Sequence, residues 1–104
     1  QGPMLIVFSR PDDTPEEIEL DLKALKYANE SEAKCWWIGI FGTPQFPVGI
    51  NLAGQGYDSK GEILAKFPCR AGELAEWVVI DPNGAVRWSG ARSPLDLKAK
   101  LTAI

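Results

Sequence analysis

The chain has 104 residues, of which 45% are hydrophobic and 24% charged, and its formal net charge is −3. This length and composition are typical of one globular domain with its own core, and so small and mixed a charge does not indicate nucleic acid as a partner. We expect no membrane insertion because no apolar run approaches a membrane span, and the absence of histidine excludes His-dependent triads and most metal sites.

The chain begins with a short polar stretch and then a buried strand. Residues 1–3 resemble the remnant of a cleaved tag, so we expect a single domain over residues 4–104; a larger parent protein stays open as an alternative. Residues Met4 to Phe8 are all apolar and rich in branched side chains. That pattern predicts a strand that is buried on both faces.

A helix is predicted directly after this strand. Thr14, Pro15 and Glu17 combine an N-cap, a proline at the first helical position and a capping-box glutamate. Residues 12–32 hold many more acids than bases, which predicts a negative, solvated helix face. The expected buried stripe of this helix consists of Ile18, Leu22, Leu25 and Ala28.

The middle of the chain predicts a second strand, a long loop and a short helix. Trp36 to Phe41 is apolar and strand-like, and residues 42–57 contain the prolines and glycines of a loop. Loops of this length in a compact domain are often functional. A turn at residues 58–61 then precedes a short helix over residues 62–67, which Pro68 ends.

The last third predicts a hairpin and a closing helix. Residues 77–81 and 85–89 form two apolar runs around Pro82-Asn83-Gly84, whose residue types are those of a tight turn. Ser93 and Pro94 then provide an N-cap and a first helical residue. The buried stripe expected for this helix is Leu97, Leu101 and Ile104.

The element order is therefore β-α-β-α-β-β-α, an α/β class. A right-handed crossover at the start and a hairpin at the end predict a four-stranded mixed sheet with helices on both faces. Residues 57–90 include "YDSKGEILAKF" and "ELAEWVVIDPNGAVRWSG". This segment resembles the thioredoxin-like thiol oxidoreductases and peroxiredoxins, a resemblance that implies the thioredoxin-like fold.

The same resemblance implies a CxxC motif after the first strand and a cis-proline before the third, and this chain has neither. Aligning Phe8 with the end of the family's first strand places residues 13–16, Asp-Thr-Pro-Glu, over the CxxC motif. Ala75 stands at the proline position, where we expect an ordinary trans peptide. Arg10 matches an arginine of peroxiredoxin sites, but the cysteine that it serves is missing.

These departures predict a binding surface where the family has an active site, and no catalytic residue, metal or cofactor is assigned. Asp13 and Glu16 are interpreted as helix N-terminal acids, with a carboxylate acid/base pair or, together with Asp12, a weak cation site as the alternatives. The rim of this vestigial site is expected to comprise Arg10, Asp12, Asp13, Glu16, Ala75, Glu76 and Trp77.

The two cysteines lie far from the aligned motif. Cys35 is expected to be buried and inert and Cys69 partly exposed, and the predicted fold places them too far apart for a disulfide. If one thiol is reactive, Cys69 beside Arg70 is the candidate, because a neighbouring cation lowers a thiol pKa.

The sequence therefore predicts a redox-inactive, non-enzymatic module that binds another protein or a domain of its parent chain, or that has a structural role in a larger assembly. The alternative is a divergent peroxiredoxin or thiol oxidoreductase that uses Cys69 or Cys35.

Overall fold

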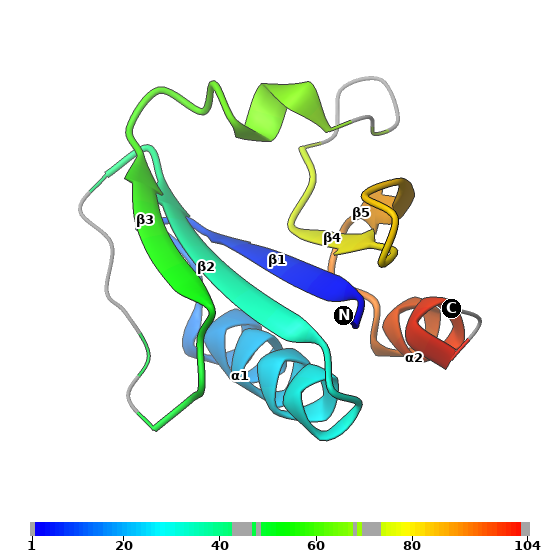
Figure 1. Ribbon diagram of the computed structural model, residues 1–104. Helices are drawn as coiled ribbons and strands as arrows, with labels where there is room; N and C mark the ends of the chain where they lie inside the picture. Colours follow the sequence, from blue (N-terminus) through cyan, green and yellow to red (C-terminus); the bar gives the residue numbers. More distant parts are fainter. Residues whose placement is uncertain (1, 43–46, 48, 68, 70–73, 103–104) are drawn as a thin grey trace.

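The computed structural model of the chain describes residues 2–42, 47, 49–67, 69 and 74–102. Within these ranges the protein forms a five-stranded sheet, two α-helices and one short 3-10 helix, η1 (Figure 1). In chain order the elements are β1 (Met4–Ser9), α1 (Pro15–Glu30), β2 (Lys34–Ile40), β3 (Gly54–Asp58), η1 (Leu64–Lys66), β4 (Trp77–Ile80), β5 (Val86–Gly90) and α2 (Pro94–Thr102).

The sheet is mixed, as predicted, with the strand order β3-β2-β1-β4-β5. β1 and β3 run parallel to β2, whereas β4 runs antiparallel to β1 and to β5. The predicted β4–β5 hairpin is confirmed. At its turn, the carboxylate of Asp81 accepts hydrogen bonds from the backbone N–H groups of Asn83 and Ala85 and from Nε of Arg87, each at 2.9 Å.

The prediction of four strands is wrong by one, because the end of the predicted loop forms β3 at the edge of the sheet. Its glycines hide it, since glycine weakens the strand pattern. At Gly54 the glycine has a packing reason: a Cβ there would lie 2.5 Å from the Trp36 ring, which covers this position from the neighbouring strand. Residues 43–46 and 48 of the predicted loop lie outside the described residues.

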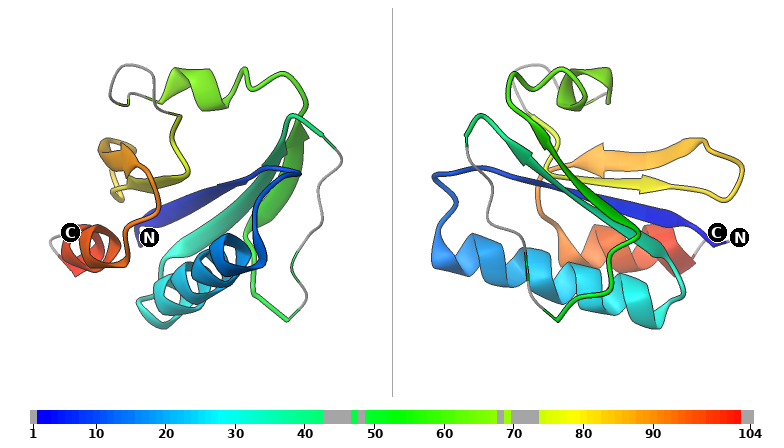
Figure 2. Two further views of the ribbon diagram at one scale, coloured as in Figure 1. Left: turned by 180° about the vertical axis from the view of Figure 1, so that it is seen from behind. Right: turned by 60° about the vertical axis from the view of Figure 1, so that its left-hand side comes forward.

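The prediction of three helices is confirmed only in part, because the second of them is a short 3-10 helix, η1, on the face opposite the two α-helices. Both α-helices lie on one face, as the two views in Figure 2 show. Leu25 of α1 and Leu97 of α2 pack in the same core cluster as Val7 and Trp37 of the sheet. The closing helix ends at Thr102 in the described part of the chain, so Ile104 of its predicted stripe lies outside that part.

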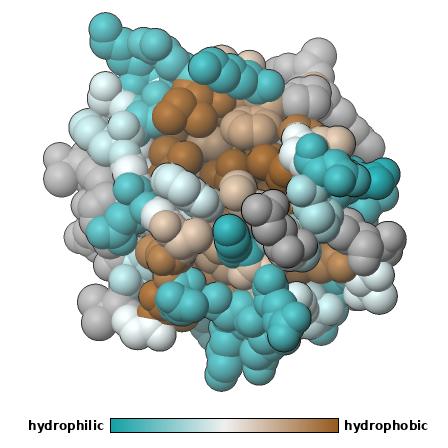
Figure 3. Space-filling model, in the orientation of Figure 1, coloured by the Kyte–Doolittle hydropathy of each residue, from teal (hydrophilic) through white to brown (hydrophobic). Residues whose placement is uncertain are grey.

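The opposite face of the sheet is covered by η1 and the segments beside it. Leu64 of η1 packs there with Phe8 and Ile38, and Figure 3 shows apolar side chains gathered between η1 and the strands. The predicted helix over residues 62–67 is reduced to this 3-10 turn, with Phe67 already extended at φ −101° and ψ 126°. The cause is Pro68, because a residue before proline is disfavoured in the helical region.

The start of α1 matches the prediction. Thr14 is the N-cap, its hydroxyl accepts the Glu17 N–H, and the Glu17 carboxylate accepts the Thr14 N–H, which completes the capping box. The buried stripe is turned by about one residue from the predicted one, and it contains a carboxylate. Its buried residues are Asp21, Ala24, Leu25 and Ala28, whereas Ile18 and Leu22 are partly exposed.

Candidate functional site

An arginine from the loop between β5 and α2 lies at the centre of a cluster of four carboxylates. The Arg92 guanidinium donates through Nε and Nη2 to the two oxygens of Asp21, at 2.9 and 3.1 Å. Nη2 also donates to Asp13 at 2.8 Å, and Nη1 donates to Glu17 at 3.3 Å and to Glu76. These five hydrogen bonds use all five N–H donors of the guanidinium. We call Arg92, Asp13, Glu17, Asp21 and Glu76 the Arg92 cluster.

The Arg92 cluster joins three parts of the chain that are far apart in the sequence: the β1–α1 loop with the start of α1, the residue before β4, and the loop after β5. Asp13 comes from the β1–α1 loop, Glu17 and Asp21 from the first turns of α1, and Glu76 from the residue before β4. The side chains of Arg92, Asp13 and Asp21 are only 5%, 4% and 0% exposed, whereas those of Glu17 and Glu76 are 40% and 21% exposed. The cluster therefore has a buried interior and a carboxylate rim at the surface.

Further hydrogen bonds hold each carboxylate in place. The N–H of Arg10 donates to Asp13, and the N–H of Arg92 itself donates to Glu76, at 2.9 and 3.1 Å. The indole Nε1 of Trp77 donates to Asp21 at 2.7 Å, entirely within the core. Bidentate and charge-assisted bonds of this kind fix geometry as well as charge, so the cluster is rigidly positioned.

The ionisation of the cluster reflects its burial. Desolvation raises the pKa of Asp21 to about 6, and the hydrogen bonds from Arg92 and Trp77 offset this only in part. Desolvation alone would lower the pKa of Arg92, but the hydrogen bonds and charges of Asp21, with those of Glu76 and Asp13, together raise it. At the rim, the hydrogen bond from the Thr14 N–H lowers the pKa of Glu17. Arg92 thus stays cationic, and Asp21 titrates closest to neutral pH among these three groups.

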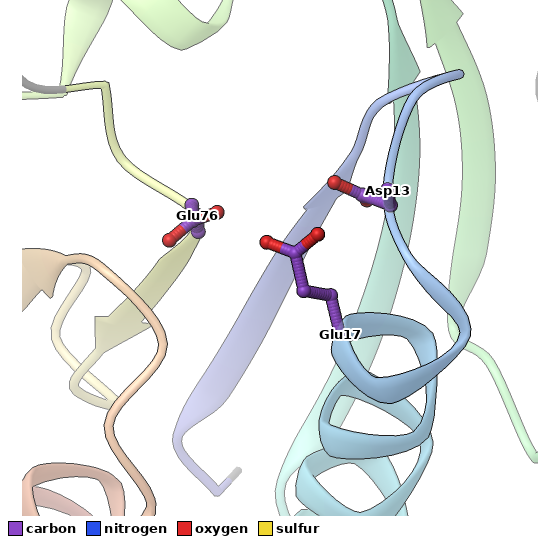
Figure 4. Close-up of side chains that lie close together, drawn as sticks. All are labelled: Asp13, Glu17 and Glu76. Carbon is purple, nitrogen blue, oxygen red and sulfur yellow. The ribbon is translucent and has the colours of Figure 1, made fainter.

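Three carboxylates of the cluster have a spacing that could suit a metal ion. Asp13, Glu17 and Glu76 turn toward one another in Figure 4, and they offer oxygens within 4.8 Å of each other. Each of them, however, accepts a hydrogen bond from the Arg92 guanidinium. The cation that this group holds is therefore the protein's own arginine, and we assign no metal site to it.

Three of the predicted rim residues belong to the cluster or contact it. Asp13 and Glu76 bind Arg92, and Trp77 binds Asp21. Ala75, by contrast, is buried in the core on the other face of the sheet, so it offers no binding surface. The described residues contain no cis peptide bond, which confirms the trans bond expected at Ala75.

The remaining predicted rim residues lie beside the cluster. Asp12 and Glu16 are exposed, and Arg10 is partly exposed and contributes its backbone N–H to Asp13. The exposed Asp12 and Glu16 therefore add carboxylates beside the cluster, near the start of α1. Several predicted rim residues thus lie at or beside the Arg92 cluster, whose hydrogen-bonded centre also includes Glu17, Asp21 and Arg92.

Glu17, Asp21 and Arg92 were not among the predicted site residues. Asp21 carries a local signal, because it precedes Leu25 and Ala28 by four and seven positions and so falls on the buried face of α1. A carboxylate in such a stripe needs a partner within the core. Arg92 has no such signal, since its partners on α1 and the preceding loop lie 71 to 79 positions away.

The two cysteines lie apart from the cluster. Cys35 in β2 is 1% exposed, its Sγ faces the carbonyl groups of Leu25 and Ala33, and burial raises its pKa to about 11. This fits the predicted inert thiol. Cys69 is half-buried, and the two cysteines are not bonded to each other. Arg70, the cation expected beside Cys69, lies outside the described residues.

The comparisons with known proteins identify the fold. No protein-family model and no curated protein sequence matches the chain. Among solved structures, the chain is similar to the reduced form of the N-terminal domain of PilB from N. meningitidis, with 18% identity and a TM-score of 0.56. The similarity covers 98% of this chain and 78% of that one. The fold is therefore thioredoxin-like, and none of the described helices is long and apolar enough to cross a membrane.

Proposed function

We propose that this thioredoxin-like domain is redox-inactive and binds a basic segment of a partner protein at the acidic rim of the Arg92 cluster. The observation that carries the proposal is the use of all five guanidinium donors beside the start of α1, where the resemblance aligns the family's CxxC motif. The partner is another protein or a further domain of the same chain.

The location argues against thiol chemistry. A reactive thiolate in this fold family depends on the N–H groups and dipole at the start of the helix after the first strand. Here that position is occupied by Asp13 and Glu17, whose carboxylates bind Arg92. Cys35 lies beside Leu5, near the start of β1, and therefore at the opposite end of the sheet from the cluster.

The charge of the cluster supports a basic partner. Four carboxylates surround one guanidinium, and that guanidinium has no further N–H to offer. Glu17 and Glu76 keep part of their surface in solvent, and the exposed Asp12 and Glu16 add to the negative field. Surface charge of one sign steers and selects partners of the other sign.

Recognition by side chains is better supported here than addition of a partner strand. The N–H of Glu76 already donates to the Gly90 carbonyl, and its own carbonyl accepts the Phe8 N–H, both at 2.9 Å. The backbone at the start of β4 is thus bonded within the sheet. Carboxylates at the rim remain as the groups that a lysine or arginine of the partner would contact.

Titration of a fluorescently labelled lysine-glycine peptide tests this proposal. Asp12→Asn with Glu16→Gln removes two rim charges, and Glu30→Gln with Glu32→Gln removes two exposed acids at the far end of α1. We expect the rim variant to raise the Kd about fivefold and the control variant to change it by less than about twofold. Equal effects of the two variants would mean that the peptide senses only net charge, and would refute a binding site at the rim.

Redox inactivity has a separate test. The purified domain is expected to show no turnover of a disulfide or peroxide substrate in the presence of a dithiol reductant. Turnover that disappears in Cys69→Ser or Cys35→Ser would contradict the proposal and would assign a thiol enzyme instead.

A further inference from the structure

A second candidate site lies between the two helices, on the face of the sheet that α1 and α2 cover. A groove there encloses about 230 Å³. Its walls and floor are largely apolar, and its position between helices is one where ligand pockets commonly form. The described residues that line it are Leu20, Lys23, Ala24, Tyr27, Trp77, Pro94, Leu97 and Lys98.

The charged groups of the groove are both lysines, and none of the described lining residues is an acid. This differs from the rest of α1, whose charged residues are mostly acidic. Lys23 comes from α1 and Lys98 from α2, so the two ammonium groups belong to opposite walls. The chain as a whole is acidic, which makes a local basic pair beside an apolar floor a specific feature of this groove.

Each of the two lysines has one weak contact of its own, and each lines the groove from a different helix. Nζ of Lys98 lies 5.5 Å from the centre of the Tyr27 ring, and Tyr27 is one helical turn after Lys23 on α1. Lys23 pairs with Glu19 at 3.2 Å, but both side chains are more than half exposed. An exposed pair of this kind contributes little, so an incoming carboxylate can compete for Lys23.

We propose that this groove binds an apolar monocarboxylate of about ten non-hydrogen atoms, with its carboxylate within reach of the flexible side chains of Lys23 and Lys98 and its hydrocarbon part along Leu20 and Tyr27. The size follows from the volume: a cavity of about 150 Å³ holds benzene, so about 230 Å³ holds roughly nine atoms and leaves the charged end at the mouth. A neutral or cationic molecule of the same shape would not use the lysines.

Trp77 connects this groove with the Arg92 cluster. Its ring lines the groove, and its Nε1 donates to Asp21. Trp77 is buried beneath the groove, so a ligand that occupies the groove is expected to shift its indole N–H signal. That signal distinguishes occupancy of the groove from binding of a carboxylate to exposed lysines elsewhere, such as Lys60.

An NMR titration with octanoate tests the proposal, with octylammonium and 1-octanol as probes of the same length but different charge. We expect saturable shifts of the Trp77 indole and of the α1 and α2 amides, with a Kd on the order of 1 mM or tighter. Octylammonium and 1-octanol are expected to bind at least about tenfold more weakly.

Two matched double variants locate the carboxylate. Lys23→Gln with Lys98→Gln removes both groove lysines, and Lys26→Gln with Lys100→Gln removes one lysine from each of the same helices outside the groove. The first variant is expected to weaken octanoate about tenfold and the second less than about twofold. Absence of saturable shifts, equal binding of octylammonium, or equal loss in both variants would each overturn the proposal.

The proposal for this groove and the proposal for the acidic rim can be refuted independently of each other. Asp12→Asn with Glu16→Gln leaves the groove residues unchanged, so it is expected to leave octanoate binding unchanged as well. A loss of octanoate binding in that variant would contradict a site formed by the two helices.

Discussion

Replacing Arg92 by methionine is the most direct perturbation of the candidate site. Methionine keeps an unbranched apolar stem but removes all five N–H donors, so Asp13 and Asp21 remain buried at 4% and 0% exposure without their counter-charge. Breaking a buried ion pair by removing one partner costs about 3 to 5 kcal/mol. A domain of ordinary stability has about 5 to 15 kcal/mol in total, so Arg92→Met is expected to lose a large share of it.

The assay is urea unfolding at pH 7, followed by tryptophan fluorescence. Arg87→Met is the matched control, because Arg87 also pairs with a buried carboxylate, Asp81, but is itself 58% exposed. We expect a loss of less than about 1 kcal/mol in the control and of about 3 kcal/mol or more in Arg92→Met. A loss at Arg92 no larger than that at Arg87 would refute the claim that the cluster stabilises the fold.

The pH dependence of this loss gives a second check. The pKa of Asp21 is already raised to about 6 by burial, and removing Arg92 removes a group that lowers it. A carboxylate whose pKa is raised on folding favours the folded state while it is protonated, and this contribution is lost as pH rises through the folded pKa. The deficit of Arg92→Met is therefore expected to be larger at pH 7 than at pH 4.5. A deficit that is constant across this range would mean that charge burial is not its cause.

Three further predictions follow from single contacts. Asp21→Asn removes a group whose pKa of about 6 lies above the ordinary 3.8. The stability of the wild type relative to this variant should therefore fall by about 2 kcal/mol from pH 4 to pH 7, measured by urea unfolding. Gly54→Ala places a methyl group 2.5 Å from the Trp36 ring and is expected to cost about 1 to 3 kcal/mol, whereas Gly56→Ala, which meets nothing within 4 Å, should cost less; equal losses would contradict the packing argument. Folded Arg92→Met leaves three carboxylates without the guanidinium, and their oxygens lie within 4.8 Å of one another. Ca²⁺ at pH 7 is therefore expected to raise the melting temperature of this variant but not that of the wild type.

The strands and the helix start that position the site could be predicted because their causes are local. The apolar run of β1 and the capping box of Thr14 and Glu17 depend on a few neighbouring residues, and both form as expected. β3 was hidden for the opposite reason. Gly54 is suited to the ring of Trp36 on the next strand, and that contact cannot be read from the local sequence around the glycine.

The residues of the Arg92 cluster likewise divide into those that local sequence can locate and those that depend on distant contacts. Asp13, Glu76 and Trp77 could be found because they lie where β1 ends and β4 begins, which an element order and a resemblance can locate. Arg92 could not be found in this way, because it is one cation in a loop. Its role depends on carboxylates of the β1–α1 loop and α1 that lie 71 to 79 positions away in the sequence. The second predicted helix forms only as the 3-10 helix η1, since the residue before Pro68 is disfavoured in the helical region.

The Arg92 cluster also explains how acids are tolerated in a buried position at the start of α1. The start of α1 stabilises negative charge whatever group carries it, so Asp13 and Glu17 can take that position. Burying Asp13 and Asp21 then requires a cation that can serve several carboxylates at once, and a lysine, with three donors on a single nitrogen, could not reproduce the five bonds of Arg92. That arginine has no further N–H to offer, and the carboxylates of Glu17 and Glu76 remain 40% and 21% exposed, which is the physical basis for seeking a basic partner there.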